Sequence, residues 1–420
     1  MTTPQRWWPG PLDVEGLAVE AVGAARSAVE EVVAARRLRV RVRTSVTGVP
    51  GAFAALEHLR VDGRALAAWA PYSGFFPTAE GWVRLHGNYP HHSAVIEWVL
   101  GVADREELTR ALLRREAQEV EDAVTEAGGI GVRVRRTDEW AAHPHALAVS
   151  GDPWVQVEPG QARPLESSAD LPLTGIRVLD LTRVIAGPTC SQLLACLGAD
   201  VLRIDPPQRP ELIGQYLSNS LGKRSAVADL ARVGHTVRER LLPRTDIVLL
   251  GYRPRALARF GLDPATLRET RPHLIVGSLS AWGDRGPWGE RAGFDSIVQA
   301  ASGIATTCAD DEGRPGALPV QALDHATGYR LAAGVLTLLA QGRGGLVRAS
   351  LLGAARTLLA RPGAAGADRP EQVGVPAPET VTVDSPHGRL EAIPPPIRLD
   401  GESLTGAIGG YGAASLAWAR

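Results

Sequence analysis

Lysine is almost absent from this sequence. The chain of 420 residues carries 45 basic residues, and Lys223 is the only lysine among them. An excess of arginine, alanine and glycine is typical of GC-rich coding and says nothing about function. Because an ammonium is a compact point charge and a guanidinium is a wide planar fork, a surviving lysine can mark a narrow pocket of carbonyls or carboxylates. A leftover on the surface is the alternative, and the sequence leaves both open.

Cysteines, net charge and long apolar runs are also scarce. The three cysteines, Cys190, Cys196 and Cys308, fit neither a zinc-site spacing nor a disulfide framework, which predicts a reduced, cytoplasmic protein. The net charge of −1 favours no nucleic-acid partner. The start, MTTPQRWWPG, has no apolar signal region. The longest helical apolar stretch, residues 331–340, is about half a membrane span, so we expect no membrane partner.

Residues 1–153 have the mixed pattern of a smaller domain. Residues 14–36 show helical spacing of Val and Ala, and RRLRVRVR at 36–43 alternates basic and apolar residues, which predicts a half-exposed strand. An anion site on that strand is the less favoured interpretation. Residues 105–129 read as an amphipathic helical stretch that ends in glycines.

Three histidines lie close together at His86, His91 and His92. No acid or cysteine accompanies them at ligand spacing, so we predict no metal site, with a metal centre as the weaker alternative.

A parallel-sheet domain is predicted after a linker rich in Pro, Ser and acids at 154–175. In residues 176–360, apolar strands alternate with short helices, as in a parallel sheet covered on both faces. Ligands of such sheets bind at the carboxyl ends of the strands. Residues 361–420 read as a Pro/Gly-rich tail, with a flexible surface segment at 362–380. The predicted strands are 176–181, 200–204, 246–252 and 273–282.

The first strand–loop–helix unit of this domain lacks the glycines that a dinucleotide needs. Its turn, VIAGPTCS, contains only Gly187, and Pro188 has no N–H to offer a pyrophosphate. NAD is therefore disfavoured, even though Asp205 follows at the position expected of a ribose-binding acid.

The amino-acid sequences of this unit and of four later motifs resemble those of family III CoA-transferases, the formyl-CoA transferase and carnitine CoA-transferase type. The motifs are, in order, LTGIRVLDLTRVIAGPTCSQLLACLGADVLRID, NSLGKRSAVADL, YRPRALARFGL, SLSAWGDRGPWGERAGFDSIVQAASG and QALDHATGYRLAAGVLTLLAQ. The resemblance implies an α/β fold, with a Rossmann-like parallel sheet domain of the family III CoA-transferase type plus a smaller α+β domain. GWVRLHGNYPHH and DEWAAHP resemble the family's small domain, which normally follows the last of these motifs; here it precedes the sheet.

The resemblance implies a transferase that moves CoA between an acyl-CoA and a small carboxylic acid, with Asp324 as the nucleophile. Such an enzyme uses coenzyme A as the acyl-CoA substrate and requires no metal. Asp324 precedes an apolar helical stretch, so an ordinary N-cap is the alternative role. PYSGFF, which contains Gly74, is the predicted loop over Asp324, and a CoA phosphate is a further possible partner for Lys223.

The resemblance also implies a CoA site, which is obtained by matching positions of this sequence with the CoA contacts of the family. The formyl-CoA type has a glutamine where Ile185 stands, so a polar contact near the reacting carbonyl is lost here. The alternative role of Arg259 is a solvated helix arginine. The implied contacts are Ile185, Ala186, Ala228, Asp229, Leu230, Ala231, Gly251, Tyr252, Arg253, Arg259, Ser280, Ala281 and Trp282.

Two other functions stay open. A racemase relative removes an α-proton with a histidine near Gly293, where this chain has Phe294 followed by Asp295; a phenyl ring cannot take a proton. A catalytically silent family member, acting as a binding or partner subunit, is the other alternative, favoured by Ile185 and by the rearranged order. The resemblance also implies an interlocked homodimer.

Overall fold

A seven-stranded, mostly parallel sheet organises the computed structural model, which describes residues 6–66, 69–168, 170–361 and 374–419. The strand order is β10-β9-β8-β11-β12-β13-β7, and only β7 runs antiparallel to its neighbour. The α/β fold class is confirmed. The strands are β7 (Val155–Ala162), β8 (Arg177–Leu181), β9 (Asp200–Asp205), β10 (Lys223–Val227), β11 (Ile247–Leu250), β12 (Ile275–Ser280) and β13 (Arg343–Ser350).

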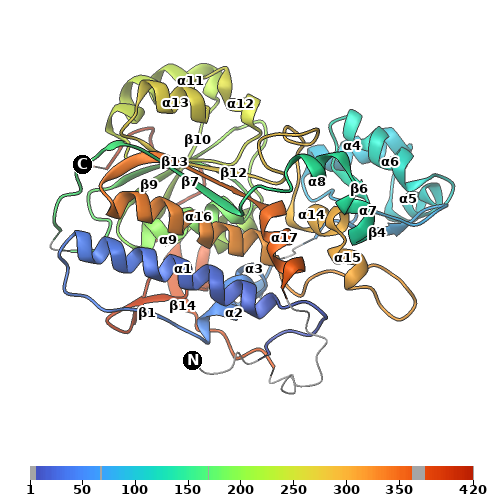
Figure 1. Ribbon diagram of the computed structural model, residues 1–420, viewed down its shortest axis with the longest axis horizontal. Coiled ribbons are helices and arrows are strands. Elements are labelled where there is room, and N and C mark those ends of the chain that lie inside the picture. Colours follow the sequence, from blue (N-terminus) through green and yellow to red (C-terminus); the bar gives the residue numbers. More distant parts are fainter. Residues whose placement is uncertain (1–5, 67–68, 169, 362–373, 420) are drawn as a thin grey trace.

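Helices cover both faces of this sheet (Figure 1). Alternate side chains of one strand enter different cores: Val178 faces one helical layer and Leu179 the other. This explains why the strands read as continuous apolar runs. One face carries α1 (Val14–Ala35), α9 (Ala186–Cys196) and α16 (Ala322–Ala340), and the other carries α11 (Leu230–Thr236), α12 (Pro254–Ala258) and α13 (Pro264–Thr270).

The smaller α+β unit has its own core at one end of the molecule. Its three-stranded antiparallel sheet is packed by Phe76, Val83 and Ile96, among others. The predicted helical stretch at 105–129 is two helices, because the chain turns between them. The elements are β4 (Gly74–Pro77), β5 (Trp82–Leu85), α4 (Pro90–Leu100), α5 (Arg105–Leu112), α6 (Ala117–Glu126) and β6 (Gly131–Arg133).

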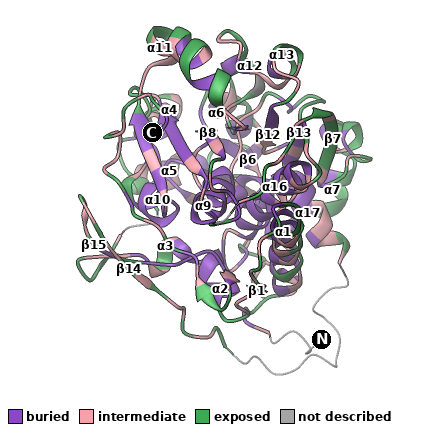
Figure 2. Ribbon diagram, turned by 90° about the vertical axis from the view of Figure 1, so that its left-hand side faces the viewer, coloured by how far each residue is buried: buried purple, intermediate pink, exposed green. Residues whose placement is uncertain are grey.

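The predicted boundary at residue 153 is wrong for the first helix. The side chains of Leu17, Ala21 and Val32 are fully buried in the same core as α16, so α1 belongs to the large sheet domain (Figure 2). The helix itself is as predicted. The predicted strand at 36–43 is shorter and later, β1 (Val42–Thr44).

The predicted linker at 154–175 contains an element of the sheet. β7 pairs along β13, and Trp154, just before it, is buried with its indole N–H 3.2 Å from the Thr327 hydroxyl. Only the remainder of the linker, after Ala162, runs without helix or strand in the part described.

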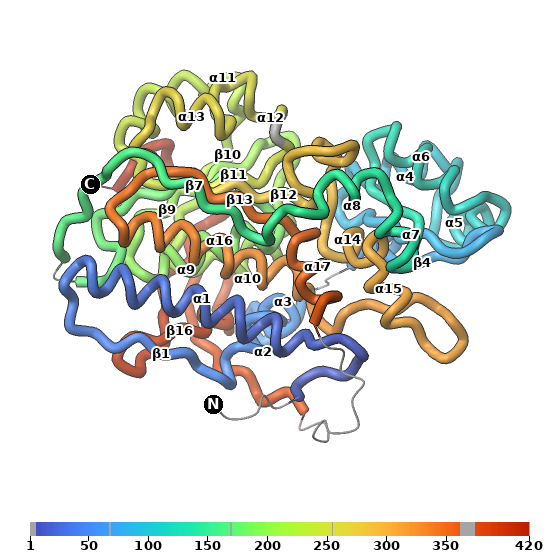
Figure 3. The backbone as a smooth tube through the Cα atoms, in the orientation of Figure 1, coloured from blue at the N-terminus to red at the C-terminus, as the bar shows by residue number. Residues whose placement is uncertain are grey.

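The prediction of a tail at 361–420 is wrong over residues 374–419, which contain four strands. Strands β14 (Val381–Ser385) and β15 (Gly388–Ala392) extend the pair of β2 (Arg60–Val61) and β3 (Arg64–Ala65). Strand β16 (Ile397–Leu399) pairs with β1 on one side and with β17 (Glu402–Ser403) on the other. Segments from the N-terminal and C-terminal parts of the chain therefore lie side by side, blue against red in Figure 3. Most of the predicted flexible segment, residues 362–373, lies outside the described residues.

In the described residues, no helix is long and apolar enough to cross a membrane.

Candidate active site

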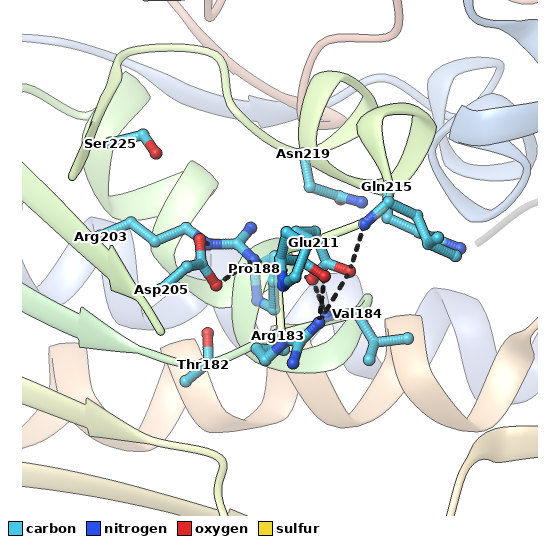
Figure 4. Close-up of polar contacts among 12 residues, drawn as sticks. Thr182, Arg183, Val184, Pro188, Arg203, Asp205, Glu211, Gln215, Asn219 and Ser225 are labelled. Atoms are coloured by element: carbon cyan, nitrogen blue, oxygen red, sulfur yellow. Dashed lines mark hydrogen bonds and ion pairs between the residues drawn. The ribbon is translucent and has the colours of Figure 1, made fainter. Parts of the chain in front are cut away.

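The loop after β8 is held in an unusual shape. Val184 has φ of 70°, a left-handed conformation that a β-branched residue rarely adopts. Its N–H donates to the Glu211 carboxylate at 2.9 Å, and the Arg183 guanidinium lies 3.7 Å from the same carboxylate (Figure 4). One buried acid therefore fixes the strained loop.

Glu211 belongs to a buried ion cluster. The Arg203 guanidinium, fully buried in β9, contacts Asp205 and Glu211 at 2.8 Å each. Burial alone would raise the pKa of Glu211, but Arg203 and Arg183 outweigh it and hold that pKa below its usual value. Asp205, at the position expected of a ribose-binding acid, is thus committed to a structural ion pair.

Gly187 serves close packing. A Cβ atom on Gly187 would lie 2.2 Å from the Cβ of Thr182, so only glycine lets α9 approach the end of β8 this closely. Gly187 therefore has a structural role: it allows α9 to pack closely against the end of β8.

The lone lysine is buried beneath this helix. The Lys223 ammonium donates to the Ser191 hydroxyl at 2.8 Å and to the Pro188 carbonyl at 3.3 Å, and lies 3.6 Å from the Asp180 carboxylate. Burial lowers its pKa to about 8, which Asp180 only partly offsets. The prediction of a narrow polar pocket is confirmed, and the surface alternative is wrong.

Lys223→Arg is expected to lower the free energy of unfolding by about 1–3 kcal/mol, because a planar fork overfills this closed site. Denaturant unfolding followed by tryptophan fluorescence measures it. Arg224→Lys, one residue on and partly exposed, is the matched control and should cost less than about 1 kcal/mol. Equal effects of the two exchanges would show that the pocket does not select lysine.

Asp324 occupies the first turn of α16 and is almost fully buried. It is the third helical residue; the N-cap is Gln321, so the N-cap alternative is wrong. Its backbone N–H donates to the Asp295 carboxylate at 3.0 Å. Burial, and then the charge of Asp295, raise the pKa of Asp324 well above its usual value. The pKa of Asp295 is also raised by burial.

Two cavities meet at Asp324, at the carboxyl edge of the sheet. The smaller, about 230 Å³, is bordered by Arg183, Arg209, Arg253 and Arg291. The larger, about 540 Å³, has mainly apolar and aromatic walls. Both cavities are lined by Tyr89, Val184, Phe294 and Asp324. A molecule with an anionic part and an apolar part could therefore place its junction at this carboxylate.

Many of the predicted CoA contacts converge on these cavities. Ile185 lines the larger cavity. The smaller is lined by Ala186, Gly251, Tyr252, Arg253, Ser280 and Ala281.

The other predicted contacts do not line either cavity. Ala228, Asp229, Leu230 and Ala231 lie where β10 meets α11, at the same edge of the sheet, and Asp229 caps that helix. Arg259 is exposed at the end of α12, with its guanidinium 4.6 Å from the Phe260 ring. The Trp282 ring is buried in a cluster with Trp140 and Trp288.

The three histidines line the cavities. His91 and His92 border the smaller cavity and His86 the larger. Burial lowers the pKa of each histidine below its usual value. Within the ranges described, no group of three or more His, Cys, Asp or Glu side chains is placed to hold a metal ion. The His86 ring stacks on Phe294 at 3.8 Å between centroids.

The loop predicted to cover Asp324 borders its cavity: Ser73 and Phe75, on either side of Gly74, line the larger one. Sequence reasoning missed Arg84, Arg183, Arg209 and His325. Arg84, Arg183 and His325 lie within the quoted motifs and Arg209 outside them, but no motif gives any of the four a role, and only the fold brings them to the cavities.

Fold and cavities together define an α/β protein in which two cavities lie where the carboxyl ends of the strands meet a smaller domain. The model of CoA-transferase family III matches residues 173–385, just over half of the chain. The chain belongs to this family.

Two curated relatives each match less than half of this chain. A probable fatty acyl-CoA transferase, Rv3272 of Mycobacterium tuberculosis, is 38% identical over 182 residues, 40% of this chain and 46% of the relative. A succinate–glutarate CoA-transferase of Agrobacterium fabrum is 33% identical over 212 residues, 45% of this chain and 53% of the relative. A crystal structure of Rv3272 aligns with a TM-score of 0.42 at 35% identity, over 46% of this chain and 57% of that one. The chain spans about half the length of the curated relatives it matches.

Proposed function

We propose that this protein moves CoA between an acyl-CoA thioester and a carboxylic acid through a covalent CoA thioester of Asp324. The observation that carries the proposal is the place of Asp324: a buried carboxylate where an arginine-bordered cavity meets an apolar one. The family membership and the CoA-transferase relatives support the same class of reaction.

The chemistry needs a carboxylate and the exclusion of water. The ionised Asp324 attacks the thioester carbonyl, the C–S bond breaks, and a mixed anhydride and CoA thiolate form. The thiolate attacks the aspartyl carbonyl, releases the donor acid as its carboxylate and leaves the aspartyl thioester. The acceptor carboxylate then repeats these steps in reverse. With 5% of its surface exposed, Asp324 is shielded from the water that would hydrolyse these intermediates.

The smaller cavity would hold CoA. Arg209 and Arg253 are exposed at its border, and in the described part of the chain neither guanidinium makes a hydrogen bond or an ion pair. Free guanidinium groups at a cavity mouth suit phosphate. By contrast, Arg291 already donates to Glu121, Thr125 and the Gly131 carbonyl.

Exchange of labelled CoA between an acyl-CoA and a panel of acids tests the proposal. Transfer to any acid supports a transferase, and its absence with every pair supports the catalytically silent alternative. The α-proton chemistry of a racemase has less support, because Phe294 stands at the start of α14 (Asp295–Ser302) and cannot exchange protons. An interlocked homodimer in the cytoplasm remains part of the proposal.

Activity is expected to rise with pH through a range above that of an ordinary carboxylic acid. The nucleophile must be ionised, and burial together with Asp295 raises the pKa of Asp324. Asp295→Asn removes the neighbouring negative charge, so the acidic limb of kcat/KM should move to lower pH. A pH profile of both proteins measures this. An acidic limb that stays in place in the variant would mean that Asp295 does not set the ionisation of the nucleophile.

A further inference from the structure

Arg84 is a buried cation in the wall of the larger cavity. It projects from β5 of the smaller domain, with 8% of its surface exposed, and lines the cavity that also contains Asp324. Its neighbours there include the aromatic rings of Trp69 and Phe75. A charged group in such walls is costly unless something compensates it.

The guanidinium has aromatic neighbours, and although the charge of the buried Asp295 acts on it, the two side chains form no ion pair. It lies 5.2 Å from the centroid of the Trp69 ring and 4.9 Å from that of Phe75. Among the residues described, its side chain makes no hydrogen bond and no ion pair, and its Nε atom is buried without a partner. Stacking uses the faces of a guanidinium and leaves the N–H donors along its edge available.

Two of the other buried arginines of this fold contact carboxylates, and the third, Arg36, donates to the Thr174 carbonyl at 3.0 Å. Arg135 lies 2.8 Å from Glu121, and Arg203 lies between two acids. The acids that line the cavity with Arg84 are Glu57 and Asp324, and neither makes an ion pair with it. Burial lowers the pKa of Arg84 to about 10, so the side chain stays charged at neutral pH. An anion that enters the cavity would supply the missing partner.

We propose that Arg84 binds a second carboxylate of the substrate, remote from the reacting carbonyl, so that the protein prefers dicarboxylic acids and their CoA thioesters. The inference rests on the proposed function, which puts the reacting end of the same molecule at Asp324. The methylene groups between the two ends would pack against the aromatic walls, and the planar guanidinium suits two parallel hydrogen bonds to a carboxylate.

A chain-matched pair of substrates tests the inference. Glutaryl-CoA and pentanoyl-CoA have five acyl carbons each and differ at the remote end. The wild type should prefer glutaryl-CoA, and Arg84→Met should lower the ratio of the two kcat/KM values by about 100-fold. Arg105→Met is the matched control, because its guanidinium lies 4.6 Å from the Phe76 ring but does not line the cavity. It should leave the ratio unchanged.

If Arg84→Met lowers kcat/KM equally for both substrates, the inference is overturned. Arg84 would then act on the ionisation of Asp295 and Asp324 instead of binding the remote carboxylate. So would a wild type without preference for glutaryl-CoA. Arg84→Gln gives a second variant if Arg84→Met fails to fold.

A binding measurement separates this inference from the proposed function. Glutarate, more than pentanoate, should raise the melting temperature of the wild type, and Arg84→Met should abolish the difference. If the wild type transfers no CoA but shows this Arg84-dependent shift, the proposed function fails and the carboxylate site stands. If it transfers CoA without the shift, the carboxylate site fails.

Discussion

Asp324→Ala is expected to lower CoA transfer by about 10³-fold or more, because no other group supplies the nucleophile. Asp324→Asn should be as inactive, since it keeps the shape of the side chain and removes its reactivity. The labelled exchange assay measures both. A variant that keeps more than about a tenth of the wild-type turnover would exclude a covalent aspartyl mechanism.

Loss of folding should not explain that result. A raised pKa means that the folded protein holds a proton that the unfolded chain releases at a pH of about 3.9. The stability that Asp324 contributes is therefore complete below that pH and is lost as pH rises through the raised value. At neutral pH, Asp324→Asn should melt at the wild-type temperature or above it.

Arg203→Met is expected to lower the free energy of unfolding by about 3–5 kcal/mol, because it leaves Asp205 buried without its ion-pair partner and Glu211 with Arg183 alone. Transfer should fall as well, since Glu211 fixes the backbone of Val184 at the site. Urea unfolding followed by tryptophan fluorescence measures the stability change.

The control for Arg203 is Arg224→Met on the neighbouring strand. Arg224 is partly exposed and pairs with Asp200 at 2.7 Å, so its loss should cost less than about 1 kcal/mol. Similar costs for the two variants would mean that the buried cluster does not hold this edge of the sheet.

The central strands could be predicted because each is buried on both faces. β8, β9, β11 and β12 read as apolar runs, and the structure places all four near the predicted positions. β7 was missed because it is a largely exposed edge strand, with a composition like that of a linker. The strands of the C-terminal segment pair with β1 and β2, more than 300 residues away, and no local pattern reports such pairing.

The site could be predicted only where a motif marked it. The resemblance predicts a catalytic role for Asp324, and the spacing of apolar residues after it predicts the helix. The ion pair that occupies Asp205 depends on Arg203 and Glu211, which the sequence shows merely as charged residues. Arg84 lies in the motif GWVRLHGNYPHH, which gives it no role, and only the packing of the smaller domain against the sheet domain makes it part of a cavity wall.

The covalent intermediate is the most direct test of the proposed mechanism. The protein is mixed with an acyl-CoA without acceptor, digested, and analysed by mass spectrometry. The mechanism predicts CoA on the peptide that contains Asp324, conversion of that residue to a hydroxamate by hydroxylamine, and neither product in Asp324→Asn. Transfer of CoA by a protein that never carries CoA or hydroxamate at Asp324 would contradict it.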